Sequence, residues 1–285
     1  MKIQAFLHEG TGTLTYVVWD DETLDGVIID PVLDYDPKAV DVDETALMDI
    51  VRFTREAGIR VHWAIETHVH ADHLSGQQVI RRELGAQLAI SARIGEVQST
   101  FKHLLDLDED LATDGSQWDR LLREGEPLAA GSLTIEPLET PGHTPACTTL
   151  RIRDAVFTGD ALFMPDFGTG RCDFPGGSAA DLYDSIQKLY ALPPETRVFV
   201  GHDYGPGGRE IRWETTISES RAHNKSCPAG RDRAEFIAWR TQRDATLSPP
   251  GLIFPALTVN ADGGMLPAPA ANGLRYIKMP MGVFS

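Results

Sequence analysis

The sequence predicts an α/β fold in which two packed β-sheets lie between outer layers of helices. Strand-like segments, rich in β-branched and aromatic residues, cluster before residue 91 and again after residue 130. Segments with helical spacing of apolar residues follow strands in both parts of the chain. Because sheets and helices must each bury an apolar face, two sheets packed together with helices outside satisfy both kinds of element.

In the first part of the chain, strands are expected at residues 3–7, 14–19, 27–29, 59–65 and 87–90. A helix is expected over residues 43–57, since apolar residues such as Leu47 and Ile50 recur at helical spacing and Gly58 ends it. Ser75 is the expected N-cap of a second helix that runs to residue 84.

A polar stretch over residues 94–124, with two expected short helices, separates the two clusters of strands. Further strands are expected at residues 133–138, 148–152, 155–158 and 196–200. Further helices are expected over residues 178–192 and near residues 213–222 and 231–246. The last forty residues are rich in Pro and Gly, so we expect them to wrap the surface without a core of their own. Residues 1–285 are expected to form one domain, with residues 206–285 as a helical and Pro/Gly-rich extension.

The composition is typical of a globular protein and excludes several classes of function. Of the 285 residues, 42% are hydrophobic, and no apolar run reaches the roughly 18 residues of a membrane span. The net charge of -16, without a Lys/Arg cluster, argues against nucleic-acid binding. The N-terminal residues lack a secretory pattern, and Cys147, Cys172 and Cys227 share no zinc-type spacing. We therefore expect a cytoplasmic protein.

Residues 68–73 hold three histidines and an aspartate in six positions. On extended backbone, His68 and His70 point to the same side, so their two imidazoles can share one cation. The turn that follows offers Asp72 and His73 to a second position. Three imidazoles so close together are not easily satisfied in an apolar interior, which favours a metal site over core burial.

Three shorter motifs place further ligands directly after predicted strands. Pro-Gly precedes His143, Thr-Gly precedes Asp160 and Val-Gly precedes His202. Each motif alone is common in turns, but the four motifs together predict one shared site. Imidazole and carboxylate ligands without a thiolate suit Zn, Fe or Mn. Zinc would activate a water for hydrolysis, whereas Fe(II) held by two histidines and one carboxylate would leave positions for O₂ and a substrate.

The order His-x-His-x-Asp-His, Gly-His, Gly-Asp, Gly-His, over residues 68–202, resembles the metallo-β-lactamase superfamily. The resemblance implies an αββα sandwich, in which two mixed β-sheets are flanked by helices and the metal site lies at the edge between the sheets. It also implies two metal positions: one with His68, His70 and His143, a second with Asp72, His73 and His202, and Asp160 between them.

The flanking segments 67–76, 158–163, 170–174 and 201–204 are similar to those of the persulfide dioxygenases, also called sulfur dioxygenases. The Gly-Arg-x-Asp-Phe segment is the most specific, because glyoxalase II enzymes typically have an aromatic residue at the position of Asp173. The resemblance implies one Fe(II) per chain, bound by His68, His143 and Asp160. On that model, His70, Asp72, His73 and His202 either support the iron ligands or belong to a second metal position that is not filled.

The same resemblance implies that glutathione persulfide is oxidised by O₂ and water to sulfite and glutathione, in a homodimer. A persulfide ionises more readily than a thiol, so its anion can bind iron as a soft ligand. Arg171 is the expected contact for a glutathione carboxylate, because guanidinium and carboxylate form a bidentate pair. A second anion contact is expected from Arg212, with Arg209 and Lys225 as neighbouring candidates.

Two further residues receive expected roles at the site. The hydroxyl of Tyr204 is expected to orient a ligand or a bound oxygen species, and Asp173 to steer a histidine. The alternative function is a dinuclear zinc hydrolase of the glyoxalase II type, acting on a thioester such as S-lactoylglutathione. That enzyme would share the fold and the ligands, so metal content distinguishes the two. A non-catalytic sensor is disfavoured, because every ligand position is intact.

Overall fold

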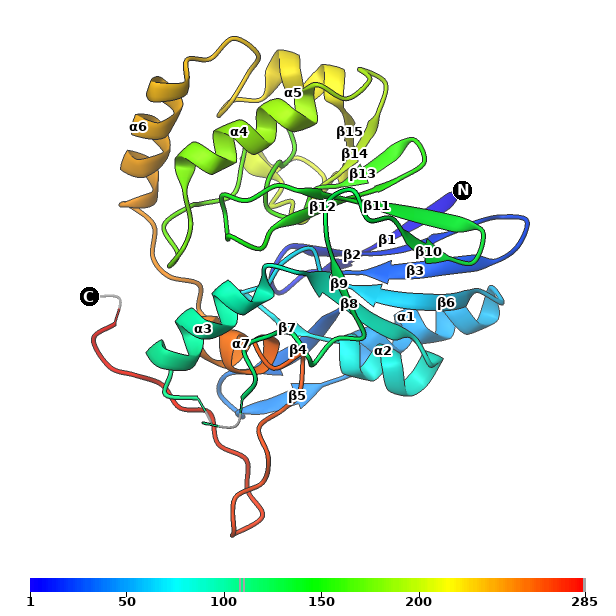
Figure 1. Ribbon diagram of the computed structural model, residues 1–285, viewed down its shortest axis with the longest axis vertical. Coiled ribbons are helices and arrows are strands. Elements are labelled where there is room, and N and C mark those ends of the chain that lie inside the picture. Colours follow the sequence, from blue (N-terminus) through cyan, green and yellow to red (C-terminus); the bar gives the residue numbers. More distant parts are fainter. Residues whose placement is uncertain (108, 110, 284–285) are drawn as a thin grey trace.

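The computed structural model describes residues 1–107, 109 and 111–283, and it confirms the predicted sandwich of two mixed sheets (Figure 1). The first sheet contains, in spatial order, β1 (Lys2–His8), β2 (Thr13–Trp19), β3 (Asp25–Ile29), β6 (Arg60–Ile65), β8 (Gln87–Ser91) and β9 (Arg120–Leu122). The second contains β10 (Leu128–Ala130), β11 (Leu133–Glu139), β12 (Thr148–Ile152), β13 (Ala155–Phe157), β14 (Arg197–Phe199) and β15 (Glu214–Thr216). A small third sheet joins β5 (Asp41–Asp43), β4 (Val32–Asp36) and β7 (Leu74–Ser75).

Within the described residues, the α-helices that cover the outer faces are α1 (Thr45–Glu56), α2 (Gln77–Leu84), α3 (Ile94–Leu104), α4 (Ala179–Tyr190), α5 (Ile217–His223), α6 (Arg233–Asp244) and α7 (Ile253–Asn260). Figure 1 shows α1, α2, α3 and α7 on the side of the first sheet, and α4, α5 and α6 on the side of the second. In the part of the chain that the structure describes, no helix is long and apolar enough to cross a membrane.

The sandwich is held together by the alternation of side chains along its strands. In β2, Leu14, Tyr16 and Val18 belong to the core that joins the two sheets, whereas Val17 belongs to the core under α1, α2, α3 and α7. Period-two alternation places successive residues on opposite faces, so one buried strand serves both cores. Burying a large apolar side chain contributes roughly 1.5–3 kcal/mol, and the two cores together fix the relative position of the sheets.

The strand directions bring several strand ends to one edge. Strands β3, β6, β8 and β9 run parallel, and so do β13 and β14, while the other neighbours are antiparallel. Parallel strands end at the same edge of a sheet. The segments after β3, β6, β13 and β14 therefore meet between the two sheets, where the predicted metal ligands follow β6, β13 and β14.

Parts of the predicted secondary structure are wrong. In the described residues of the stretch 94–124, α3 and the strand β9 stand where two short helices were expected. The segment near residues 213–222 begins as β15 before it becomes helix α5. Helix α7 was not predicted: the last forty residues have no core of their own, but Ile253, Leu257 and Val259 of α7 are buried in the core that the first sheet's helices share. Residues 108, 110, 284 and 285, which the predicted polar stretch and extension include, lie outside the described residues.

Candidate metal centre

The segment of residues 68–73 leaves the first sheet at the end of β6. Two buried residues, Glu66 and Thr67, connect Ile65 to His68. Thr67 is fixed by Asp30: its backbone N–H donates to Oδ1 at 2.7 Å, and its hydroxyl donates to Oδ2 at 2.8 Å. The backbone immediately before the first ligand is therefore anchored to a buried carboxylate.

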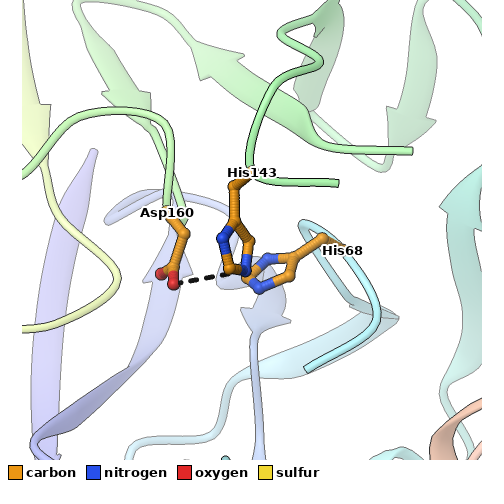
Figure 2. Close-up of side chains that lie close together, drawn as sticks. All are labelled: His68, His143 and Asp160. Carbon is orange, nitrogen blue, oxygen red and sulfur yellow. Dashed lines mark ion pairs between the residues drawn. The ribbon is translucent and has the colours of Figure 1, made fainter. Parts of the chain in front are cut away.

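His68, His143 and Asp160 come together at one point (Figure 2). One potential ligand atom of each residue lies within 4.8 Å of those of the other two. Nε2 of His143 is 3.6 Å from Oδ2 of Asp160, and the rings of His68 and His143 are perpendicular with centroids 5.0 Å apart. The three residues come from the end of β6, the β11–β12 connection and the turn after β13.

Hydrogen bonds select which nitrogen each of the two imidazoles presents. Nδ1 of His143 is 2.7 Å from the Arg171 carbonyl oxygen, which can only accept, so Nδ1 carries the proton. Nδ1 of His68 is 3.0 Å from the Thr67 hydroxyl, whose own proton goes to Asp30. Nδ1 of His68 therefore also carries the proton. Both imidazoles thus keep an Nε2 lone pair for a cation.

Burial makes the group of His68, His143 and Asp160 suited to bind a metal ion. Burial, and then the neighbouring imidazoles of His70 and His143, lower the pKa of His68 well below its usual value, so its ring is neutral as a metal ligand requires. Oδ1 of Asp160 is buried and has no hydrogen-bond donor among the described residues. A buried carboxylate oxygen without a donor is costly. A cation bound to this oxygen of Asp160 would satisfy it.

A second group of ligands, His70, Asp72 and His73, lies beside the first, with ligand atoms within 4.8 Å of one another. Nε2 of His202, which follows β14, is 3.6 Å from Asp72 and 3.4 Å from Asp160. His73 donates its Nδ1–H to the next backbone carbonyl, and its buried Nε2 has no partner in the described structure. Burial raises the pKa of Asp72, but the imidazoles of His202 and His73 outweigh it and hold that pKa below its usual range.

Beneath the second group, His70 lies between two buried carboxylates that the sequence analysis did not identify. Its Nε2 is 3.2 Å from Oδ1 of Asp30 and 3.1 Å from Oε2 of Glu66. Burial lowers the pKa of His70, but these carboxylates raise it well above its usual value. Burial raises the pKa of Glu66 to about 7. The sequence does carry a signal for both acids, since each directly follows one of two buried strands, β3 and β6, that pair in parallel.

A cavity of about 770 Å³ opens onto both groups. Its floor includes the metal-ligand candidates Asp72, His73, His143, Asp160 and His202. Four residues after the second sheet's strand β13 contribute cations to its walls: Arg171, Lys225, Arg240, which is paired with Asp244, and Arg243. Among the described residues, neither Lys225 nor Arg243 has an acidic partner within ion-pair distance, so two positive charges face a space large enough for a peptide-sized ligand.

Arg171 and Asp173 bind each other. The guanidinium donates from Nε and Nη2 to the two oxygens of Asp173, at 2.6 Å each, and from Nη1 to the Ser248 carbonyl at 2.7 Å. Partial burial raises the pKa of Asp173, but the Arg171 guanidinium lowers it more. Arg171 also holds His143 through its carbonyl, and Phe174 packs edge-on against the His143 ring at 5.4 Å. The predicted roles of Arg171 in substrate binding and of Asp173 in steering a histidine stay predictions.

Tyr204 and Arg212 occupy different surroundings. The ring of Tyr204 lines the cavity and stacks on His202, with centroids 5.7 Å apart and planes 5° apart. Gly12 makes room for this ring, because a Cβ there would lie 2.9 Å from it. Arg212 is exposed, bonds to Asp166 at 3.3 Å and is not among the residues that line the cavity. The roles predicted for both residues stay predictions.

Comparison with known proteins agrees with this arrangement. The model of the metallo-beta-lactamase superfamily matches residues 9–202. The chain is 42% identical to a probable metallo-hydrolase of Burkholderia pseudomallei, over 99% of both chains, and 41% identical to Glyoxylase B2 of Dictyostelium discoideum, over 98% of this chain and 97% of that protein. The crystal structure of ETHE1 from Myxococcus xanthus superimposes with a TM-score of 0.74 and 31% identity, over 93% of this chain and 100% of that one. The chain therefore belongs to the metallo-β-lactamase superfamily and, within it, is related to ETHE1.

Proposed function

We propose that the protein is an Fe(II)-dependent persulfide dioxygenase, which oxidises glutathione persulfide with O₂ and water to sulfite and glutathione. The observation that carries the proposal is the group of His68, His143 and Asp160, of which His143 and Asp160 line a large cavity. Two imidazoles and one carboxylate with open positions beside them are the ligand set of non-haem Fe(II) oxygenases. The likeness to ETHE1 of Myxococcus xanthus, whose human namesake is a persulfide dioxygenase, supports the same reaction.

The residues present fit a single iron. His68 and His143 each keep one nitrogen lone pair, and Asp160 keeps an oxygen without a donor among the described residues. Held by these three side chains, Fe(II) would supply binding positions for O₂ and the persulfide anion, together with the redox chemistry. The reaction balances as one persulfide, one O₂ and one water giving glutathione, sulfite and two protons, and O₂ takes up the four electrons that sulfur loses.

The protein orients the ligand histidines and limits the route to them. Asp30 orients His68 through Thr67, and the Arg171 carbonyl orients His143, so the two rings keep fixed tautomers. Outer partners of this kind typically change metal affinity 10- to 100-fold when they are removed. The ligand histidines are almost fully buried, so O₂, water and the persulfide would approach them by way of the cavity.

The cavity also fits the charge of glutathione, which brings two carboxylates. The chain has a net charge of -16, so a local cation must bind them. In this structure the Arg171 guanidinium is already bonded to Asp173 and Ser248. We therefore add Lys225 and Arg243, which face the cavity without an acidic partner among the described residues, to the predicted contacts Arg171 and Arg212.

A dinuclear zinc thioester hydrolase is the second candidate. It is favoured by the intact second group of His70, Asp72, His73 and His202, and by the similarity to a probable metallo-hydrolase and to Glyoxylase B2. Two metal ions sharing Asp160 would use every ligand present.

Metal analysis together with two assays separates the candidates. Protein purified without added metal should contain close to one iron per chain. An oxygen electrode should show O₂ uptake that depends on glutathione persulfide, with sulfite as product and no turnover of glutathione alone. Two zinc ions per chain in active protein, with rapid hydrolysis of S-lactoylglutathione and no O₂ uptake by the iron-loaded form, would establish the hydrolase instead.

A further inference from the structure

The C-terminal helix α7 bonds directly to the turn that carries the second group of ligands. Asn260, its last residue, is buried. The side-chain Nδ2 donates to the carbonyl oxygens of His70 and His73, at 2.8 Å each, and Oδ1 accepts the backbone N–H of Ser75 at 2.7 Å. Both amide protons and the amide oxygen of this one side chain are thus bound within residues 70–75.

These three bonds fix the backbone of the turn. A peptide unit is planar, so binding the carbonyl oxygens of His70 and His73 and the N–H of Ser75 orients the peptide planes between residues 70 and 71, 73 and 74, and 74 and 75. These planes precede and follow Asp72, and the backbone between them carries the second group of candidate ligands. The turn has little regular structure of its own, since the two-residue strand β7 begins only at Leu74.

The helix that provides Asn260 is itself firmly held. Leu257 and Val259 are buried with the helices of the first sheet. Just past the end of α7, the Gln98 side chain donates to the Ala261 carbonyl at 2.9 Å, and that of Gln78 donates to the Gly263 carbonyl at 2.7 Å. Asn260 lies outside residues 9–202, the part of the chain that the superfamily model matches.

We propose that Asn260 is a positioning residue of the metal centre, which holds residues 70–75 so that His70, Asp72 and His73 are presented together. The C-terminal helix is then part of the scaffold of the site. The proposal rests on the metal binding in the proposed function but not on the reaction that the metal performs.

The variant Asn260→Asp tests this role with almost no change of shape. It keeps an oxygen for the Ser75 N–H but places a second oxygen against the carbonyls of His70 and His73. The matched control is Thr258→Ala in the same helix, because in the described structure the Thr258 hydroxyl donates within α7, to the Phe254 carbonyl at 2.8 Å. Metal-free protein is titrated anaerobically with Fe(II), and separately with Zn²⁺ as a redox-inert probe, in competition with a chelator. Unfolding temperatures are measured with and without each metal.

Asn260→Asp should bind Zn²⁺ at the second group of ligands roughly 10–100-fold more weakly, as expected for the loss of a partner that orients ligands. Its affinity for Fe(II) should fall less, because the iron is expected at His68, His143 and Asp160. The rise in Tm on adding metal should shrink accordingly, because that rise depends on the metal Kd. Thr258→Ala should keep both the wild-type Kd and the wild-type rise.

If Asn260 only stabilises the fold, a different result is expected of its loss. It would lower the Tm of the metal-free and metal-loaded forms equally and leave the Kd unchanged, which would overturn the proposal. If Asn260→Asp does not fold, Asn260→Ser provides the same comparison with a smaller polar side chain. Wild-type protein that binds metal but consumes no O₂ with glutathione persulfide would reject the dioxygenase and leave the role of Asn260 standing.

Discussion

The two sheets contribute to the metal centre in different ways. The first sheet supplies four candidate ligands in one short segment after a single strand, β6: His68, His70, Asp72 and His73. The second sheet supplies three candidate ligands from three separate connections: His143, Asp160 and His202. The first sheet's ligands share one backbone, whereas each ligand of the second sheet has its own strand end.

The contacts that hold the ligand-bearing segments in place also differ between the two sheets. The first sheet's segment is held by side chains from elsewhere, Asp30 before it and Asn260 beneath it. In the second sheet, the backbone segments that carry Asp160 and His202 pack directly against each other. A Cβ at Gly201, just before His202, would lie 2.9 Å from the carbonyl of Gly159, just before Asp160. A change of support under the first sheet's segment should therefore affect several ligands together. Under the second sheet, ligands should be lost one at a time.

The largest expected effects come from the ligands themselves. His68→Ala, His143→Ala and Asp160→Ala should each lose most of the iron and nearly all activity, because a three-ligand site cannot spare a member. His73→Ala and His202→Ala should keep much of the iron, since they belong to the second position. Iron per chain and persulfide-dependent O₂ uptake measure both effects. Equal loss of iron in all five variants would show that the two positions act as one.

The sequence predicted most of what lies on long elements. It placed β6, α4 and the order of the four ligand motifs, because buried strands and amphipathic helices of this length have a clear periodicity. It missed β4, β5, β7, β9, β10 and β15, which have two to five residues each and no two adjacent apolar residues that are β-branched or aromatic. Strands as short as β13 and β14 were predicted because a Val-Phe pair marks each of them. Helix α7 was missed because Pro255 lies in it. Pro255 is the third residue of the helix, where the backbone N–H needs no partner within the helix, so the proline is tolerated.

Long-range partners could not be predicted from the sequence. Asn260 is separated by 190 residues from His70, whose carbonyl it binds, and no local pattern links the two. The pairing of Arg171 with Asp173 is local, yet we expected Arg171 to contact substrate. The sequence alone does not show whether a guanidinium is free or already paired with a carboxylate. Lys225 was named only as a neighbouring candidate, and the structure alone places it on the cavity wall.

Removing a positive charge from the cavity wall should have the next largest effect, on the KM for glutathione persulfide. Lys225 and Arg243 follow the strands of the second sheet, whereas the small third sheet contributes Asp34, on β4, to the same cavity. Losing one charge-assisted contact of about 1.5–3 kcal/mol lowers affinity roughly 10–150-fold. Lys225→Ala and Arg243→Ala should therefore raise KM for glutathione persulfide with little change in kcat, because a carboxylate is bound alike in the ground and transition states.

Two controls test this assignment. Arg212→Ala should change KM less, since Arg212 bonds to Asp166 and does not line the cavity. A small inorganic persulfide has no carboxylate, so its turnover should be the same in wild type and in both cavity variants. If Lys225→Ala and Arg243→Ala slow that substrate as much as they slow glutathione persulfide, the cations do not bind substrate carboxylates.

The smallest effect is expected where the two sheets touch at the site. Gly159 has φ +48°, and a Cβ there would lie 2.5 Å from the Thr67 hydroxyl and 3.4 Å from Nδ1 of His68. Gly125 also has a positive φ, +82°, but a Cβ there would meet nothing within 4 Å. Both Gly→Ala variants carry the cost of a left-handed backbone, roughly 1–2 kcal/mol. Only Gly159→Ala adds a steric clash, which typically costs about 1–3 kcal/mol more.

Gly159→Ala should therefore lower the free energy of unfolding by more than Gly125→Ala does, by about the cost of the clash. Because the clash pushes on Thr67, which bonds to both Asp30 and His68, Gly159→Ala should also weaken metal binding. Gly125→Ala should leave the metal Kd unchanged. Denaturant unfolding of the metal-free proteins measures the first effect, and chelator competition measures the second. Equal unfolding free energies in the two variants would mean that the contact between the sheets yields easily, and that the second sheet's ligands are held less rigidly than their close backbone contacts indicate.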